Sequence, residues 1–136
     1  MPKIIEWFTD AATAANTAKD GTGAINFLLK ADVDTYIDRI VFRAAGSNVA
    51  SVARLWLNTG ETNTVASNNT LLTEITLPAT TLSETSQLAE QKIVADLWLP
   101  AGYRLAFTLG TAVSAGYLVY IVGGTYQDLQ SNQGTN

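Results

Sequence analysis

The sequence has no cysteine and no histidine, and this double absence excludes several kinds of chemistry. Without cysteine the chain forms no disulfide bond and has no thiol nucleophile. Without histidine as well, the usual Ser–His and Cys–His nucleophiles cannot be built, and ordinary zinc sites lose their ligands. No P-loop and no dinucleotide-binding glycine motif is present. A glycosidase-type carboxylate pair is still possible, but the sequence singles out none among its 12 acidic residues, so we expect no enzymatic activity and no cofactor.

Charge is also scarce, because charged residues make up only 15% of the chain and the net charge is −4. The basic residues are scattered singly and form no stripe that would bind a phosphate backbone, so we expect no nucleic-acid partner. The most apolar stretch, 116–124, is far shorter than the roughly 20 residues of a membrane helix. The first ten residues lack the long apolar core of a signal peptide, so we also expect no export signal and no membrane partner.

What the chain does contain is alternating hydrophobicity, over 136 residues of which 47% are hydrophobic. Apolar positions recur with period two between clusters of Gly, Asn, Ser, Thr and Pro, a pattern typical of β-strands. The predicted strands are 24–30, 35–43, 49–58, 70–77, 88–99, 103–109 and 117–122. We expect the fifth and sixth of these to pair as a hairpin around Pro100-Ala101-Gly102, and 9–19 to form either an eighth strand or a short helix.

Many short strands separated by turns predict an all-β, single-domain antiparallel sandwich or barrel rather than βαβ units. We expect an N-terminal arm with a first strand or short helix at 1–23, a β-sandwich domain at 24–126 and a polar tail at 127–136. Side chains that share the apolar parity of each strand should form the core. These are Phe42, Leu55, Leu57, Ile75, Leu97, Leu105, Phe107, Val119 and Ile121.

The acidic residues Asp32, Asp34 and Asp38 are weak candidates for metal ligands. A calcium-binding EF-hand loop would need an acid and then a glycine where this chain has Tyr36 and Ile37. An acidic turn that leads into a strand, with Asp32 or Asp34 bonded to local backbone, is the favoured interpretation. If a cation binds, these three carboxylates are the candidate ligands.

Two tryptophans share a strand face with charged side chains. Trp56 and Trp98 have the parity of Arg54 and Asp96, which indicates a face other than the core. A large aromatic side chain on such a face indicates that the face is in contact with another molecule. We therefore predict an interface that contains both tryptophans, with Arg54 and Asp96 at its polar rim.

Further aromatic residues lie close to the N-terminus. Trp7 and Phe8 belong to the short apolar segment 4–8, which predicts an arm that docks on the domain or on a neighbouring molecule. Aromatic faces also stack on sugars, so the three tryptophans and five tyrosines are compatible with carbohydrate binding, although core and interface packing is the stronger interpretation.

Several segments, in their order along the chain, resemble a group of small virion structural proteins of tailed bacteriophages. They are 36–46 (YIDRIVFRAAG), 52–58 (VARLWLN), 77–80 (LPAT), 99–105 (LPAGYRL), 110–117 (GTAVSAGY) and 123–126 (GGTY). None is a catalytic motif, and no functional residue can be carried over. The resemblance implies a jelly-roll-like sandwich in the virion that decorates or cements the capsid.

This interpretation makes the chain's partners the major capsid protein, whose subunits it would bridge, and further copies of itself. We expect a homotrimer, because icosahedral shells offer many local three-fold positions. A receptor- or glycan-binding fibre or tail module is the first alternative, and a small carbohydrate-binding domain of cellular origin is the second.

Overall fold

The regular secondary structure of the protein is almost entirely β-strand. The computed structural model describes residues 3–7 and 10–125, and within these ranges it contains no α-helix, only the short 3-10 turn η1 (Ala66–Asn68). The strands are β1 (Lys3–Trp7), β2 (Asn26–Lys30), β3 (Thr35–Ala44), β4 (Ser51–Asn58), β5 (Asn69–Leu77), β6 (Glu90–Leu99), β7 (Arg104–Leu109) and β8 (Tyr117–Thr125). The seven predicted strands are all present, with bounds that differ by a few residues.

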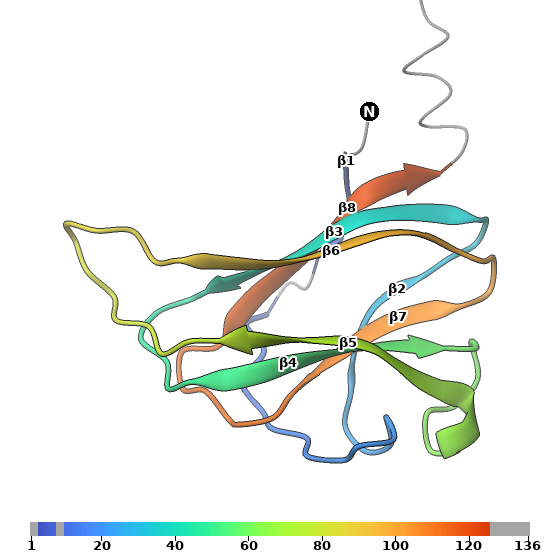
Figure 1. Cartoon of the computed structure of the whole chain (residues 1–136), viewed down its shortest axis with the longest axis horizontal. Coiled ribbons are helices and arrows are strands. Elements are labelled where there is room, and N and C mark those ends of the chain that lie inside the picture. Colours follow the sequence, from blue (N-terminus) through green and yellow to red (C-terminus); the bar gives the residue numbers. More distant parts are fainter. Residues whose placement is uncertain (1–2, 8–9, 126–136) are drawn as a thin grey trace, which may run out of the picture.

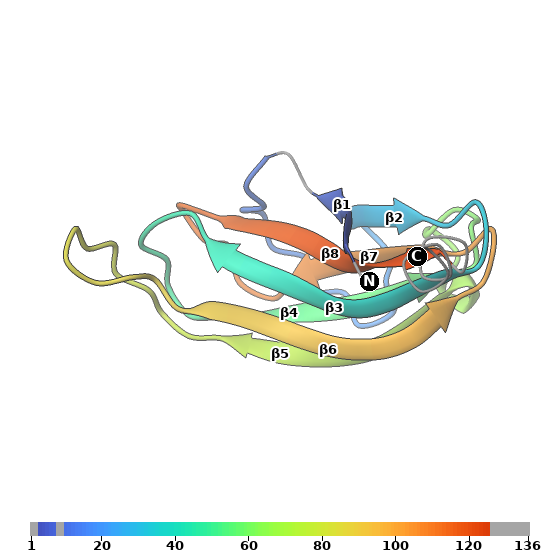
Figure 2. The same cartoon turned by 90° about the horizontal axis from the view of Figure 1, so that it is seen from above.

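The eight strands form two antiparallel four-stranded sheets. Sheet A has the order β1-β8-β3-β6 and sheet B the order β2-β7-β4-β5. The sheets lie face to face, A above B in Figure 1, and Figure 2, seen from above, shows β3 running along β4 and β6 along β5. Eight strands in two such sheets, with all but one connection passing between them, make a jelly roll. The predicted all-β sandwich is therefore confirmed.

The core lies between the two sheets. Of the predicted core residues, six are completely buried and the other three, Leu57, Ile75 and Leu97, are half-buried and pack against them. Phe42 of β3 meets Phe107 of β7 edge to face, with ring centroids 5.5 Å apart and an interplanar angle of 89°. This contact joins the central strands of opposite sheets, and edge-to-face geometry adds to the free energy gained by burial.

The predicted hairpin between the fifth and sixth segments is wrong. β6 pairs with β3 in sheet A, whereas β7 pairs with β2 and β4 in sheet B. The Pro100–Gly102 turn exists, since the Tyr103 amide donates to the Pro100 carbonyl at 3.1 Å and Gly102 has a φ of 88°. It carries the chain from one sheet to the other. The residues of a short turn determine that the chain reverses direction, but they do not determine which sheet the next strand joins.

The N-terminal segment docks on its own domain, which is one of the two predicted possibilities. Strand β1 is the edge strand of sheet A, paired with β8 through Lys3↔Gly123, Ile4↔Val122 and Trp7↔Tyr120. The described part of 9–19 is neither a strand nor a helix, and it makes only single bridges at Ala12 and Ala15. Phe8 and the tail 127–136 lie outside the described residues.

Residues 10–25 cross the side of sheet B that faces away from sheet A (Figure 1, blue). The Asn16 amide donates to the Leu109 carbonyl of β7 at 2.8 Å. Farther along the segment, Asn69 of β5 donates through its side chain to the Asp20 carbonyl at 3.1 Å. Gly21 is buried so closely against Asn69 that a Cβ there would lie 2.6 Å from the Asn69 Cβ. The strand order places β4 between these attachment points, so the segment covers it.

Replacing Phe107 by alanine should lower the free energy of unfolding by about 3–5 kcal/mol, because it removes the contact with Phe42 and leaves a cavity between the sheets. Chemical denaturation followed by circular dichroism measures the change. The control is Val94→Ala on the exposed side of β6, which should change stability by less than about 0.5 kcal/mol. Equal effects of the two substitutions would contradict this description of the core.

Candidate functional site

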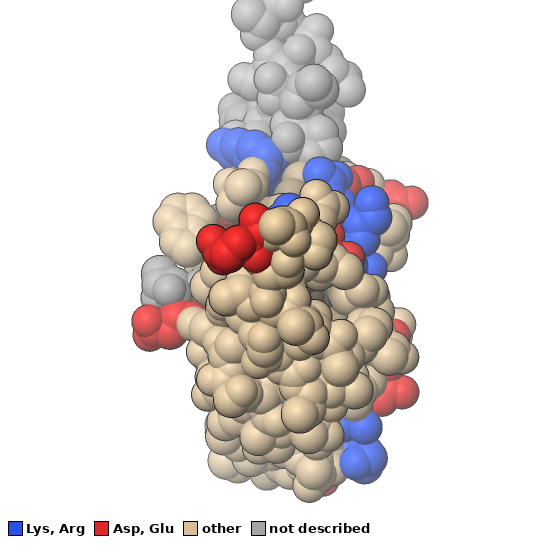
Figure 3. Space-filling view, turned by 90° about the vertical axis from the view of Figure 1, so that its left-hand side faces the viewer, with Lys and Arg blue, Asp and Glu red and all other residues tan. Residues whose placement is uncertain are grey.

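One end of the sandwich is almost free of charge. It is formed by the loops 45–50, 78–86 and 110–116, and we call it the loop end. Glu84 is the single charged residue in these three loops, which otherwise consist mainly of Ala, Gly, Ser and Thr. Figure 3 looks onto this end and shows a broad uncharged surface, with most of the charged side chains near its upper and outer margins.

A buried asparagine ties the three loops together. The Asn48 Oδ1 accepts from the amides of Ala115 at 2.9 Å and Gly116 at 3.0 Å, and its Nδ2 donates to the Gly116 carbonyl at 2.9 Å. Its backbone exchanges bonds with Thr80, whose hydroxyl in turn donates to the Gly46 carbonyl at 2.8 Å. Each loop is thus held by its neighbours, which makes the loop end rigid.

Two large aliphatic side chains project from this end. Val49 is 58% exposed and Leu82 is 56% exposed. The Leu82 amide donates to the Ser47 hydroxyl at 2.9 Å, which fixes the 78–86 loop beside the 45–50 loop. Exposed apolar groups on a rigid surface with little charge suit the central part of a protein–protein interface, because little free energy is lost when water leaves such a surface.

Replacing Asn48 by alanine should reduce the free energy of unfolding by about 2–4 kcal/mol, since the buried amide of Gly116 and the partly buried amide of Ala115 lose their acceptor. The matched control is Asn68→Ala, which removes one exposed bond to the Thr62 carbonyl and should cost less than about 1 kcal/mol. Thermal denaturation of both variants measures the difference. A tolerated Asn48→Ala would mean that the loops hold their shape without this side chain.

Trp56 and Arg54 occupy the outward face of sheet B, as their parity predicted, but Trp56 is not available to a partner. Its indole is only 2% exposed, and Nε1 donates to the Thr108 hydroxyl at 3.0 Å. Arg54 forms an ion pair with Glu74, Nε to Oε2 at 2.6 Å. The expected contact surface around Trp56 is therefore wrong, because residues 10–25 fold over this sheet, and strand periodicity carries no information about such a crossing.

Trp98 lies on the outward face of sheet A and is 46% exposed. It faces Tyr36 of β3, with ring centroids 5.5 Å apart and an interplanar angle of 51°. The Tyr36 hydroxyl donates to the Asp96 Oδ1 at 2.6 Å and lies 3.5 Å from the Asp38 Oδ1. Asp96 has a φ of 46° where the β3–β6 register shifts. We call Trp98, Tyr36 and Asp96 the aromatic platform.

The environment of Tyr36 raises its pKa from 10.0 to about 12, mainly because its hydroxyl donates to Asp96, with smaller effects of burial and of the charges on Asp96 and Asp38. The neutral phenol is the form that the fold favours. Its contribution to stability is therefore complete below pH 10 and is lost as the pH rises from 10 to about 12.

Spectrophotometric titration of the tyrosines at high pH tests this environment. Asp96→Asn should lower the pKa of Tyr36 toward its ordinary value, and Tyr36→Phe should remove the component that ionises near pH 12. If Asp96→Asn leaves the titration curve unchanged, the hydrogen bond does not control this phenol.

The candidate metal ligands do not converge. Asp34 Oδ1 accepts from the Ala101 amide at 3.0 Å, while Asp38 pairs with Arg39 at 2.5 Å. Asp32 lines a different feature, described next. In the parts of the chain that the structure describes, no group of three or more acidic side chains is placed to hold a metal ion. The bond from Asp34 also differs from expectation, because it joins the 32–34 turn to a distant turn rather than to local backbone.

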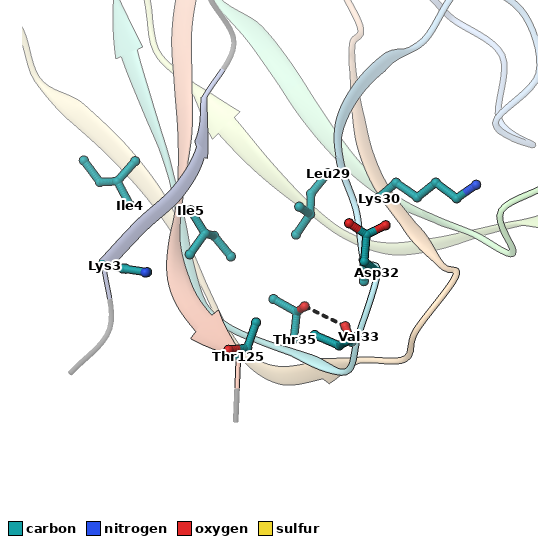
Figure 4. A pocket seen from close by; sticks show the side chains of 10 residues that line it. Lys3, Ile4, Ile5, Leu29, Lys30, Asp32, Val33, Thr35 and Thr125 are labelled. Atoms are coloured by element: carbon teal, nitrogen blue, oxygen red, sulfur yellow. Dashed lines mark hydrogen bonds between the residues drawn. The ribbon is translucent and has the colours of Figure 1, made fainter. Parts of the chain in front are cut away.

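A hollow of about 400 Å³ opens between the edge strands β1 and β2 (Figure 4). Ile5 and Leu29 point toward each other across it, whereas the Lys30 amine points away. Thr35, at its floor, donates to the Val33 carbonyl at 2.8 Å. The hollow is thus lined by both apolar side chains, such as Ile5 and Leu29, and polar ones, such as Asp32 and Thr35.

Comparison of the chain with protein families, with curated proteins and with solved structures finds no match. Among the described residues, no helix is long and apolar enough to cross a membrane. The loop end and the aromatic platform are therefore the features from which function has to be argued.

The sequence analysis predicted Trp98 and Asp96 as site residues, but it missed Asn48 and Tyr36. Asn48 sits in a Gly-Ser-Asn turn signal, and nothing in that signal shows that three loops meet there.

Proposed function

We propose that this protein decorates the capsid of a bacteriophage: it binds the outer surface of the shell and stabilises it by bridging neighbouring major capsid subunits. The observation that carries the proposal is the loop end, a rigid and almost uncharged surface at one end of a jelly roll. The exposed apolar side chains Val49 and Leu82 are the residues of this surface that we expect to anchor a protein partner.

Two physical features support docking through the loop end. Removing water from a charged side chain is costly unless the partner supplies a matching charge, and Glu84 is the only such residue in the three loops. The bonds of Asn48 hold the surface in one shape before binding, so little conformational entropy is lost when a partner docks.

The segments that resemble phage virion proteins lend further support. Three of them, 36–46, 77–80 and 110–117, run into the loops of this end. An enzyme is the weaker alternative, because the chain contains neither histidine nor cysteine.

Introducing charge at the loop end tests the proposal. The double variant Val49→Glu, Leu82→Glu should bind at least tenfold more weakly to heads of the encoding phage that have been prepared without the protein, because each glutamate would be buried without a partner. Val33→Glu is the matched control: Val33 is 54% exposed and lies at the opposite end of β3, so this variant should bind as the wild type does. Co-sedimentation of purified protein with heads gives the affinity and the number of copies bound.

Two outcomes would contradict the proposal: wild-type protein that does not bind the heads, or a double variant that binds as tightly as the control. Circular dichroism establishes that the variants are folded.

We further propose that the protein binds as a trimer at local three-fold positions of the shell. Analytical ultracentrifugation of the free protein and the symmetry of the bound copies test that number.

A further inference from the structure

We propose that the aromatic platform binds a saccharide: the pyranose ring of a neutral, hydroxyl-rich glycan stacks on Trp98, and Asp96 accepts a hydrogen bond from one of its hydroxyl groups. This site goes beyond capsid decoration and is separate from the loop end. Trp98 stands next to the Pro100–Gly102 turn, whereas the loop end lies at the other end of the sandwich.

The indole offers the stacking surface. Among the described residues β6 is the outermost strand of sheet A, and none of the described strands of the sheet lies beyond Trp98. Tyr36 supports the other side of the indole through the tilted ring contact at 5.5 Å. The negative face of an aromatic ring attracts the weakly positive C–H groups of a sugar ring. Because Tyr36 limits the rotation of Trp98, the platform is formed before the ligand arrives.

Asp96 supplies the polar contact. Its Oδ1 accepts from the Tyr36 hydroxyl at 2.6 Å, and within the described residues its Oδ2 has no hydrogen-bond partner. The nearby Asp38 is already paired with Arg39 at 2.5 Å, which leaves Asp96 as the available acceptor. A carboxylate oxygen beside an exposed indole matches a ligand that has both an apolar face and hydroxyl groups.

The backbone holds Asp96 in this position. Its φ of 46° lies in the left-handed region, which a residue other than glycine adopts at some energetic cost. The register between β3 and β6 shifts at this point, since Ile37 pairs with Leu97 but Arg39 pairs with Val94. Such bulges redirect a side chain, and here the carboxylate is brought beside Tyr36 and Trp98.

The same geometry argues against a cationic ligand such as a quaternary ammonium group. Aromatic sites for such cations place ring faces around the charge. Tyr36 and Trp98 are in contact with each other, so there is no space between the two rings for a cation. A ligand has to lie on the outer surface of the indole, which suits the C–H face of a pyranose ring.

The test begins with the full-length protein on an array of plant, animal and bacterial-surface oligosaccharides, followed by calorimetric titration with the tightest-binding soluble one. We expect Trp98→Ala to weaken binding at least tenfold and Trp98→Phe to restore part of it, because a smaller ring still stacks. Asp96→Asn should weaken binding several-fold, since asparagine tolerates the left-handed backbone but removes the charge that strengthens the hydrogen bond. Choline chloride serves as the cationic probe.

Trp7→Ala is the matched control, because Trp7 is also on the outward face of sheet A and is 58% exposed, but lies on β1 at the opposite edge. It should bind the oligosaccharide as the wild type does. No binding to any oligosaccharide on the array, equal losses in Trp98→Ala and Trp7→Ala, or choline binding in place of sugar would overturn the proposal. The double variant Val49→Glu, Leu82→Glu should bind the oligosaccharide as tightly as the wild type does. The saccharide proposal and the capsid-docking proposal can therefore be disproved independently of each other.

Discussion

The packing of the two sheets against each other is the interaction on which the rest of the structure depends. Phe42 and Phe107 meet at its centre, and the surrounding aliphatic side chains exclude water from both inner faces. Because the inner faces supply most of the stability, the exposed parts of the outer faces and loops can carry binding surfaces. The loop end and the aromatic platform are both built on this support, one at each end of the sandwich.

The two candidate surfaces are shaped by polar groups rather than by the core. Asn48 holds three loops with its amide, and Tyr36 holds Asp96 with its hydroxyl. In each case a hydrogen bond fixes a surface before any partner binds, which reduces the entropy lost on association. The loop end carries little charge and suits a protein, whereas the platform combines an indole with a carboxylate and suits a sugar.

The sequence predicted much of the fold but less of the surfaces. Period-two hydrophobicity located seven strands, because each has one buried face, and it placed residues such as Phe107 in the core. It did not assign strands to sheets, so β6 and β7 were wrongly paired. It also identified Trp56 as an interface residue, since no local pattern shows that residues 10–25 cross sheet B. Trp98 was recognised as lying outside the core, but its partner Tyr36 is 62 positions away along the chain and was found only through the β3–β6 pairing.

The proposed capsid decoration is tested most directly by a cryo-electron microscopy map of the phage heads to which we propose that this protein binds. Capsid decoration predicts jelly-roll density on the outer surface of the shell, with residues 45–50, 78–86 and 110–116 facing the major capsid protein and bridging neighbouring subunits. Heads that contain no such density, or copies that contact the shell through another surface with the loop end in solvent, would contradict it.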